Sequence, residues 1–285
     1  MASRSLWLLA AVMGLMGCAA PAPDTSRPDP FQINQLQQLL PADAILLGEQ
    51  HDAPEHQRIH RLTVEALAAQ HTLAVLALEM ASQGQSTETL GADANEDQVR
   101  AALAWDNAGW PWTAYGPVVM AAVRAGVPVV GANLPRARLR EAMTDSGFDR
   151  LLSGPALKAQ QQQVRAGHCE LLPESQISSM TRIQIARDVA MAQTVLKRAV
   201  AGKTVLLLAG GAHVDRSLGV AQHLPPGFKV KAVLLLAEQA PHAIEKIANF
   251  DQVWFTQPVP PVDYCANFAA QRATKAAEPV SGKTP

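Results

Sequence analysis

Two histidines in this chain end the same short motif, and each motif follows an apolar stretch. The motif is G-x-x-H, at Gly48–His51 and again at Gly210–His213. Glu49 lies inside the first motif, and Glu79 ends a third apolar stretch. Imidazole and carboxylate groups suit Zn, Mn, Fe or Co, and without a metal they can act as general acid and base. The candidate catalytic and metal-binding residues are Glu49, His51, Glu79 and His213, unless the glutamates only cap helix amides.

Two further histidines, His56 and His60, lie four residues apart in a stretch with helical periodicity. Residues at this spacing share one face of a helix, so the pair could bind a metal. Histidines on a solvated helix surface have the same spacing, so both interpretations stay open.

The segment Trp105–Tyr115 holds three of the five tryptophans of a chain with 5% aromatic residues. Its glycine and proline prevent a regular helix throughout. It is either a hydrophobic loop packed over a sheet edge or the wall of a site for a flat apolar ligand. In the second case the phenol of Tyr115 is available to iron, and the only other tyrosine is Tyr264. The candidate ligand contacts in this segment are Trp110, Trp112 and Tyr115.

Other chemistries lack their usual motifs. The sequence has no G-x-S-x-G, no P-loop and no G-x-G-x-x-G, so serine hydrolase and nucleotide-binding functions lose their support. It also lacks C-x-x-C-H, which excludes covalent haem of the c type. The formal net charge is −1 and no basic run occurs, so a nucleic-acid surface is not expected.

The elements that position these residues alternate between apolar strands and helices. The strands are near-continuous runs of Ala, Val, Leu and Ile, which is typical of a parallel sheet covered on both faces. We expect an α/β fold with a central, largely parallel sheet, helices on both faces and helical insertions. Parallel strands end at one edge, so Glu49, Glu79 and His213 would converge there with Asn133. The predicted strands are Ala44–Leu47, Leu73–Leu78, Val127–Ala132, Thr204–Ala209, Lys231–Leu236 and Gln252–Thr256.

The helices are predicted from apolar periodicity and from residues typical of helix ends. After a turn at Gly48, Asp52 is expected to cap the second helix, with Pro54 in its first turn and Glu55 completing a capping box. Ser178 is expected to cap the longest helix, and Leu151–Pro173 to be irregular or helical. The predicted helices are Phe31–Leu40, Ala53–Gln70, Val99–Ala104, Ala114–Ala125, Leu134–Met143, Ser178–Ala201 and one near Ala243–Ala248.

The first residues have the pattern of an export signal. Arg4 precedes an apolar core, Leu6–Met16, that is too short to span a bilayer as a mature helix. The core leads to Leu-Met-Gly before Cys18, which resembles a bacterial lipobox, so we expect lipidation of Cys18, with ordinary signal-peptidase cleavage as the alternative. The expected organisation is a signal peptide at 1–17, a Pro-rich tether at 18–30, an α/β domain at 31–268 and a disordered tail at 269–285.

Export leaves two cysteines in the mature domain, Cys169 and Cys265. In an oxidising compartment two cysteines favour one disulfide, which would tie the C-terminal segment to the middle of the chain. Closing such a long loop stabilises a fold by about 2–4 kcal/mol. The bond could also hold His168, which precedes Cys169, near the candidate site.

Several stretches together resemble the ChaN-type haem-binding, iron-regulated lipoproteins, from about residue 40 to 265. They are LLGEQHDAPEHQRIHRLTVEAL, LALEM, GWPWTAY, VPVVGANLPR, GHCELLP, IQIARDVAMA and LLLAGGAHVDRSLGVAQHLP. The wider superfamily is similar to the Tiki and TraB proteins and the erythromycin esterases. Those proteins share a G-x-x-H, a Glu after the next strand and a distal His.

This resemblance implies non-covalent haem binding between the monomers of a dimer. It implies a Tyr ligand to iron, and Tyr115 is the tyrosine that falls within a matching motif. It also implies His and Lys of the partner at the propionates, and His51 or His168 could be that histidine. Tiki-like relatives are metal-dependent proteases, whose motifs would fall on His51, Glu79 and His213, with Glu49 alongside.

The expected function is therefore that of a membrane-anchored haem-binding protein in haem and iron uptake, which does no chemistry on haem. Ala19 after Cys18 does not signal retention in the inner membrane, so the expected location is the outer membrane, with an outer-membrane haem receptor as a candidate partner. The alternative is a metal-dependent hydrolase, a peptidase or esterase, using the Glu/His cluster. A third hypothesis is an envelope protein in which that cluster is structural.

Overall fold

The computed structural model describes residues 30–237 and 248–277. The expected signal peptide at 1–17, the lipid attachment at Cys18 and all but the last residue of the tether at 18–30 lie outside these residues, as does most of the helix expected near Ala243–Ala248. Among the described residues, no helix combines the length and the apolar character needed to cross a membrane.

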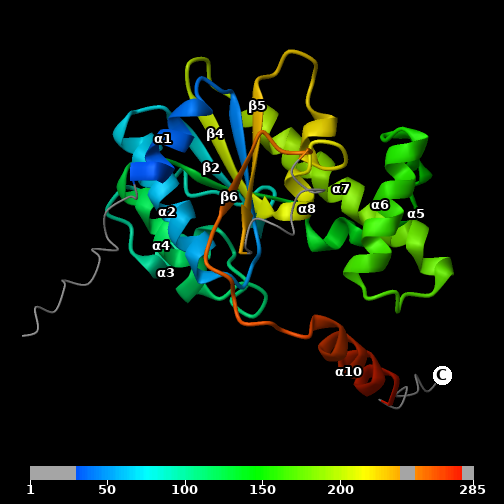
Figure 1. Ribbon diagram of the computed structural model, residues 1–285. Coiled ribbons are helices and arrows are strands. Elements are labelled where there is room, and N and C mark those ends of the chain that lie inside the picture. The colour runs from blue at the N-terminus through cyan, green and yellow to red at the C-terminus, as the bar shows by residue number, and fades with distance from the viewer. Residues whose placement is uncertain (1–29, 238–247, 278–285) are drawn as a thin grey trace, which may run out of the picture.

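A six-stranded parallel sheet forms the centre of the fold, in the order β3-β2-β4-β1-β5-β6 (Figure 1). The predicted α/β class is therefore confirmed. β1 and β4 are buried along their whole lengths, which explains why both are continuous apolar runs. The strands are β1 Ala44–Glu49, β2 Leu73–Ser82, β3 Val129–Asn133, β4 Thr204–Gly210, β5 Val230–Leu236 and β6 Gln252–Phe255.

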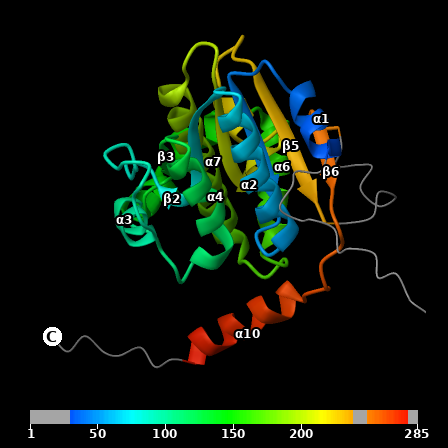
Figure 2. The same ribbon diagram turned by 90° about the vertical axis from the view of Figure 1, so that its left-hand side faces the viewer.

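Helices cover both faces of the sheet. Helices α2 (Pro54–Ala69) and α4 (Trp112–Arg124) pack against each other on one face, where α2 also contacts β1 and β2 (Figure 2). The other face is covered by α7 (Glu174–Arg198), which contacts β2, β3 and β4. Two helices pack on α7 and form the helical insertion, α5 (Leu139–Thr144) and α6 (Gly154–Gly167).

Each face has its own apolar core. Ile59 and Leu67 of α2 and Val118 of α4 are buried in the first, and Met191 and Val195 of α7 are buried in the second. The remaining helices are α1 Pro30–Gln38, α3 Glu96–Ala102, α8 Gly211–Val214 and α10 Tyr264–Ala277, with 3-10 turns at Arg136–Arg138, Ser146–Arg150 and Val220–His223.

Several predicted helix and strand ends were wrong, among them the end of β2, which runs on to Ser82, and the starts of α3 and α5. β1 continues through Gly48, so the turn begins after Glu49 rather than at the glycine. Ala53 occupies the N-cap of α2 without a side-chain hydrogen bond, so Asp52 is not the cap, although Pro54 lies in the first turn as predicted. α7 begins directly after Pro173, four residues before Ser178, and it ends at Arg198 before the expected stop.

The C-terminal segment also differs from its prediction. Helix α10 extends through Ala277, into the part at 269–285 that was expected to be a disordered tail, while 278–285 lie outside the described residues. Figures 1 and 2 show α10 separated from the sheet, below the end at which β1 and β4 finish. The helix therefore lies on the side of the fold that carries the candidate site.

Candidate functional site

The two G-x-x-H motifs lie side by side because their strands are neighbours. β1 and β4 pair in parallel, with Glu49 opposite Gly210. Gly48 has no room for a side chain, since a Cβ atom there would lie 2.3 Å from Cγ2 of Val214. The predicted convergence of the two motifs at one edge of the sheet is confirmed.

One carboxylate organises the first motif. Oε1 of Glu49 accepts hydrogen bonds from Nδ1 of His51 at 2.7 Å and from the hydroxyl of Tyr115 at 2.5 Å. Because a carboxylate can only accept here, the proton of the bond to His51 belongs to Nδ1, which leaves Nε2, on the side of Gly210, without that proton. Oε2 of Glu49 lies 3.4 Å from Nδ1 of the buried His60. The side chain of Glu49 is fully buried, whereas that of His51 is 42% exposed.

Two carboxylates, those of Asp188 and Glu79, surround the histidine of the second motif. Nδ1 of His213 lies 2.5 Å from Oδ1 of Asp188, and its Nε2 lies 3.4 Å from Oε1 of Glu79. Oε2 of Glu79 accepts the backbone N–H of Gly210 at 2.7 Å. All three side chains are buried. The result is a histidine held between two carboxylates.

The two groups meet at Gly210. A Cβ atom on this residue would lie 3.0 Å from Nε2 of His51 and 3.6 Å from Oε2 of Glu79. A cavity of about 650 Å³ opens here. Its lining includes Glu49, His51, Glu79 and His213 together with Asp52, Arg187 and Tyr264.

The group formed by Glu79, Asp188 and His213 is strongly charged at neutral pH. Burial alone lowers the pKa of His213, but Glu79 and Asp188 outweigh it and raise that pKa to about 10. Burial acts to raise the pKa of Glu79, yet His213, His51 and the Gly210 amide lower it to about 2. Burial raises the pKa of Asp188 to about 6, against the attraction of His213. His213 is therefore an imidazolium and cannot serve as a general base near neutral pH.

The group around Glu49 contains His51, a histidine whose pKa is shifted less strongly than that of His213. Burial lowers the pKa of His51, but its hydrogen bond to Glu49 and the charges of Glu79 and Glu49 raise it overall. Burial lowers the pKa of His60, and it lowers the pKa of His56 to about 4, so both rings are kept neutral. Both His56 and His60 are buried on α2, so the interpretation of this pair as solvated surface residues was wrong. His56 bonds instead to Gln50 N–H and Thr256 Oγ1.

The metal prediction gains no support from this geometry. Among residues 34–237 and 248–270, no group of three or more His, Cys, Asp or Glu side chains is arranged to hold a metal ion. The ring of His213 is already engaged by two carboxylates, and Oε1 of Glu49 by two donors. The four candidate residues are assembled as two hydrogen-bonded groups and not as a ligand shell.

Tyr115 is buried and is not among the residues that line the cavity. Its side chain is 1% exposed, and its hydroxyl bonds to Glu49 beneath the rings of Trp105 and Trp110. Burial, with the charge of Glu49, raises the pKa of Tyr115 and keeps it a phenol. Of the two interpretations of this segment, its packing at Tyr115 fits the hydrophobic loop, and the role of Tyr115 as an iron ligand stays a prediction.

The rest of the aromatic segment divides in the same way. Trp112 is buried, and its Nε1 donates to Oε2 of Glu96 at 2.8 Å. Trp110 is half-buried and meets the ring of His51 edge-on at 4.8 Å. Of the three aromatic candidates, Trp110 meets the ring of a cavity-lining histidine, and Tyr115 bonds to Glu49 from the buried side.

Tyr264 is the other of the two tyrosines that could ligate the iron of haem. It is 52% exposed, lines the cavity, and donates a hydrogen bond to Oδ2 of Asp52. That bond raises the pKa of Tyr264 and lowers the pKa of Asp52. Asp188 was missed, since it lies in the middle of a long helix with no motif around it. The position of Tyr264 directly before Cys265 was the one available signal for its place in the fold.

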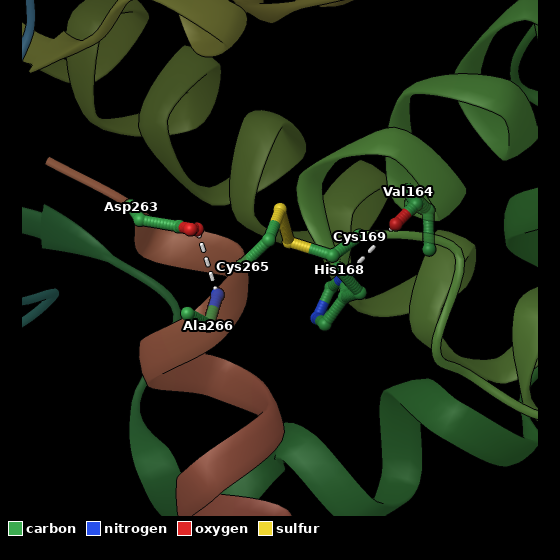
Figure 3. The surroundings of a disulfide bond; sticks show 6 residues. All are labelled: Val164, His168, Cys169, Asp263, Cys265 and Ala266. Carbon is green, nitrogen blue, oxygen red and sulfur yellow. Dashed lines mark hydrogen bonds between the residues drawn. A yellow bond between two sulfur atoms is a disulfide. The ribbon is translucent and has the colours of Figure 1, made fainter. Parts of the chain in front are cut away.

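The predicted disulfide is present and joins α10 to the turn after α6 (Figure 3). Cys169 and Cys265 have a Cα–Cα distance of 5.5 Å and are 96 positions apart in the sequence. His168 beside it donates from Nδ1 to the carbonyl of Val164 at 2.7 Å and packs edge-on against Phe268. His168 thus lies against α10, outside the residues that line the cavity.

A parallel α/β sheet with a polar cavity at the carboxyl ends of its strands defines a ligand-binding α/β protein. The family model described as haem-binding uptake, Tiki superfamily, ChaN matches residues 35–224. The chain therefore belongs to this family of haem-binding uptake proteins, as its sequence motifs predicted.

The chain is also similar to several solved structures. The chain is similar to ChaN of Campylobacter jejuni, whose structure describes cofacial haem binding, with 25% identity, a TM-score of 0.58, and coverage of 73% of this chain and 86% of that chain. An erythromycin esterase mutant, EreC, in its open conformation matches with 16% identity, a TM-score of 0.47, and coverage of 75% and 74%. RRSP, a MARTX toxin effector domain of Vibrio vulnificus, matches with 13% identity, a TM-score of 0.45, and coverage of 85% and 41%. No protein of curated function gives a significant match.

Proposed function

We propose that this protein is a lipid-anchored haem carrier of the bacterial cell envelope, which binds haem without a covalent bond through the phenolate of Tyr264. Membership of the family supports haem binding, and the lipobox-like sequence before Cys18 supports attachment of a lipid anchor. The outer membrane is the proposed location, with a haem receptor there as the donor.

The position of Tyr264 carries this proposal. The chain has two tyrosines, and Tyr115 is buried under tryptophans with its hydroxyl bonded to Glu49. Tyr264 is exposed at the cavity, and its hydroxyl already donates to Asp52. Tyr264 would hold haem through its iron, which phenolates can ligate. Asp52 would accept the phenolic proton, so the residue that raises the pKa of Tyr264 would also take up its proton.

The cavity also suits the charged edge of a porphyrin. Arg187 and His51 lie in its lining, and the pKa of His51 is raised. Propionates are carboxylates, which pair well with guanidinium and imidazolium groups. Trp110 beside His51 supplies an aromatic surface. These residues of the one chain would orient haem while Tyr264 holds iron.

Haem binding at the interface of a dimer is part of the proposal. Large apolar side chains near the end of the chain are exposed, namely Phe255, Val262 and Tyr264, and Leu171 close to the disulfide is exposed too. Monomers rarely leave apolar surface uncovered around a binding site. The Campylobacter jejuni relative binds haem cofacially, and two haems face to face would be enclosed by two copies of such a surface.

A haem titration of the oxidised chain tests the proposal. We expect a saturable Soret band and a phenolate-to-iron charge-transfer band, with two chains per complex by light scattering. Tyr264→Phe should remove the charge-transfer band and weaken binding, whereas the matched variant Tyr115→Phe should keep both. Absence of saturable binding, or loss of the band in Tyr115→Phe alone, would refute the assignment.

Hydrolysis remains a second candidate because of the buried group Asp188–His213–Glu79. Tyrosine ligation of iron does not need a histidine fixed between two carboxylates. In a hydrolase, His51 oriented by Glu49 would activate water, and the imidazolium of His213 would stabilise the developing negative charge. Release of a chromophore from simple esters and peptides, lost in His51→Asn, would support this activity, and absence of turnover across pH 5 to 9, a range of about two units on each side of neutrality, would exclude it for those substrates.

A further inference from the structure

Helix α10 is joined to the body of the protein at its first turn. The preceding segment at 256–263 contains three prolines and follows the last strand, β6. From Tyr264 to Ala270 every side chain is exposed except that of Phe268, which is half-buried. The contacts that link the helix to the rest of the chain include the disulfide of Cys265, the ring contact of Phe268 with His168, and the hydrogen bond of Tyr264 with Asp52.

The cysteine on the body side sits on a turn built to present it. Cys169 and Glu170 have φ values of 58° and 56°, in the left-handed region that residues other than glycine seldom adopt. Backbone bonds hold this conformation, from Cys169 N–H to Ala166 at 2.9 Å and from Glu170 N–H to Arg165 at 2.9 Å. The turn is therefore fixed by α6 and projects Cys169 toward α10.

The cysteine on the helix side is adjacent to Tyr264. Asp263 closes this first turn, since its Oδ1 accepts the N–H of Ala266 at 2.8 Å and its carbonyl accepts the N–H of Asn267 at 3.2 Å (Figure 3). A bond from Cys265 to the body thus fixes the backbone next to Tyr264 as well. Without the bond, the proline-containing segment would be the covalent link between the iron-ligand candidate and the sheet.

We propose that the Cys169–Cys265 disulfide is a positioning element that holds Tyr264 over the cavity, so that haem is held while the bond is formed and released when it is reduced. This inference rests on the proposed function of Tyr264 as the iron ligand. Reduction by a dithiol breaks the Sγ–Sγ bond, transfers two electrons and two protons, and leaves two cysteine thiols, while the dithiol becomes a disulfide. The partner chemistry is therefore that of a thiol–disulfide oxidoreductase in the envelope.

The loss of haem affinity expected on removing the disulfide has an upper limit. A ligand residue on a fixed turn binds without the ordering cost that a residue on a free segment must meet. Loss of the disulfide therefore weakens haem binding, by about 10- to 100-fold if the segment behaves as a flexible tether. The loss cannot exceed the loss caused by Tyr264→Phe, because the disulfide acts through that phenol.

Haem titrations of the full chain in detergent test this inference. The samples are the oxidised wild type, Cys169→Ala, Cys265→Ala and Tyr264→Phe, with Cys18 unchanged in all of them. We expect both cysteine variants to weaken haem binding and to lose the phenolate charge-transfer band. In the double variant of Cys169→Ala and Tyr264→Phe, we expect the affinity of Tyr264→Phe alone. Far-UV circular dichroism confirms that each variant is folded, and wild type reduced by a dithiol and then freed of it provides a sample without substitutions.

The outcomes separate two failures. If oxidised wild type binds no haem, or if Tyr264→Phe binds as well as wild type, the proposed function and this inference both fail. If wild type binds through Tyr264 while the cysteine variants and the reduced protein keep its affinity and its band, only the inference fails. If the cysteine substitution weakens binding equally with and without Tyr264, the disulfide is a general structural cross-link and does not position the tyrosine.

Discussion

The hydroxyl of Tyr115 donates a 2.5 Å hydrogen bond to Oε1 of Glu49, across 66 positions of sequence. That oxygen also accepts from His51, so a phenol on α4 fixes the carboxylate of β1 that in turn orients a cavity histidine. The phenol is 1% exposed, and two tryptophan rings pack on it. The tyrosine within the most distinctive aromatic motif therefore supports the site from behind.

Tyr115→Phe should lower stability and leave the haem spectrum intact. The substitution removes a buried donor and leaves Glu49 with one partner fewer on Oε1, which costs about 1–3 kcal/mol. Urea unfolding measures the loss of free energy, and the Soret and charge-transfer bands report the iron ligand. Unchanged stability would mean that water replaces the phenol, and a changed charge-transfer band would return Tyr115 to consideration as a ligand.

Gly210→Ala should separate His51 from Glu79. The added Cβ would lie 3.0 Å from Nε2 of His51, so the ring must move away from the negative charge that helps to raise its pKa. We expect the pKa of His51, followed by NMR titration of its ring protons, to fall. Gly154→Ala is the control, because nothing lies within 4 Å of a Cβ at that position. An unaltered pKa of His51 in Gly210→Ala would show that the two groups act independently.

Stability should depend on pH through His213 and Glu79. The pKa of His213 rises from 6.5 unfolded to about 10 folded, so its contribution is complete below pH 6.5 and is lost as pH rises toward 10. The pKa of Glu79 falls from 4.5 to about 2, so its contribution is complete above pH 4.5 and is lost toward pH 2. Asp188, whose pKa is raised from 3.8 to about 6, adds a loss as pH rises through that range. Stability should therefore decline above pH 6.5 through His213 and below pH 4.5 through Glu79, while Asp188 makes it fall between pH 3.8 and about 6 as pH rises.

Urea unfolding across this range gives the measurement. One linked proton produces a slope of up to about 1.4 kcal/mol per pH unit on the alkaline side. His213→Gln should flatten that slope, and His71→Asn is the control at an exposed position with positive φ, which asparagine tolerates. A slope that persists in His213→Gln would assign the linkage to another group.

The fold was predictable because its central strands are easily recognised in the sequence. β1 and β4 are buried on both faces, so their sequences are uninterrupted apolar runs, and the residues that follow them were correctly placed at one edge. The element ends were less predictable. Ala53 occupies the N-cap position of α2, although Asp52 has the better capping side chain. Asp52 bonds instead to Tyr264, a tertiary contact that no local pattern records.

The site was predicted only in part for a similar reason. Glu49, His51, Glu79 and His213 were found because each lies at or near a strand end, where sequence order determines position in space. Asp188 and Tyr264 reach the site from α7 and α10, and only the packing of those helices brings them there. The burial of Tyr115 could not be predicted, because its motif shows that aromatic residues gather but not which of them face the core.

Haem affinity should rise with pH if Tyr264 is the ligand. The hydrogen bond to Asp52 raises the pKa of the phenol, so binding as a phenolate releases a proton throughout the neutral range. Release of one proton predicts an affinity that increases about tenfold per pH unit. Titrations at several pH values give this slope, and the same series on Tyr264→Phe subtracts the pH dependence of free haem. A slope shared by both proteins would mean that the linked proton belongs to another group, such as His51, and would count against phenolate ligation.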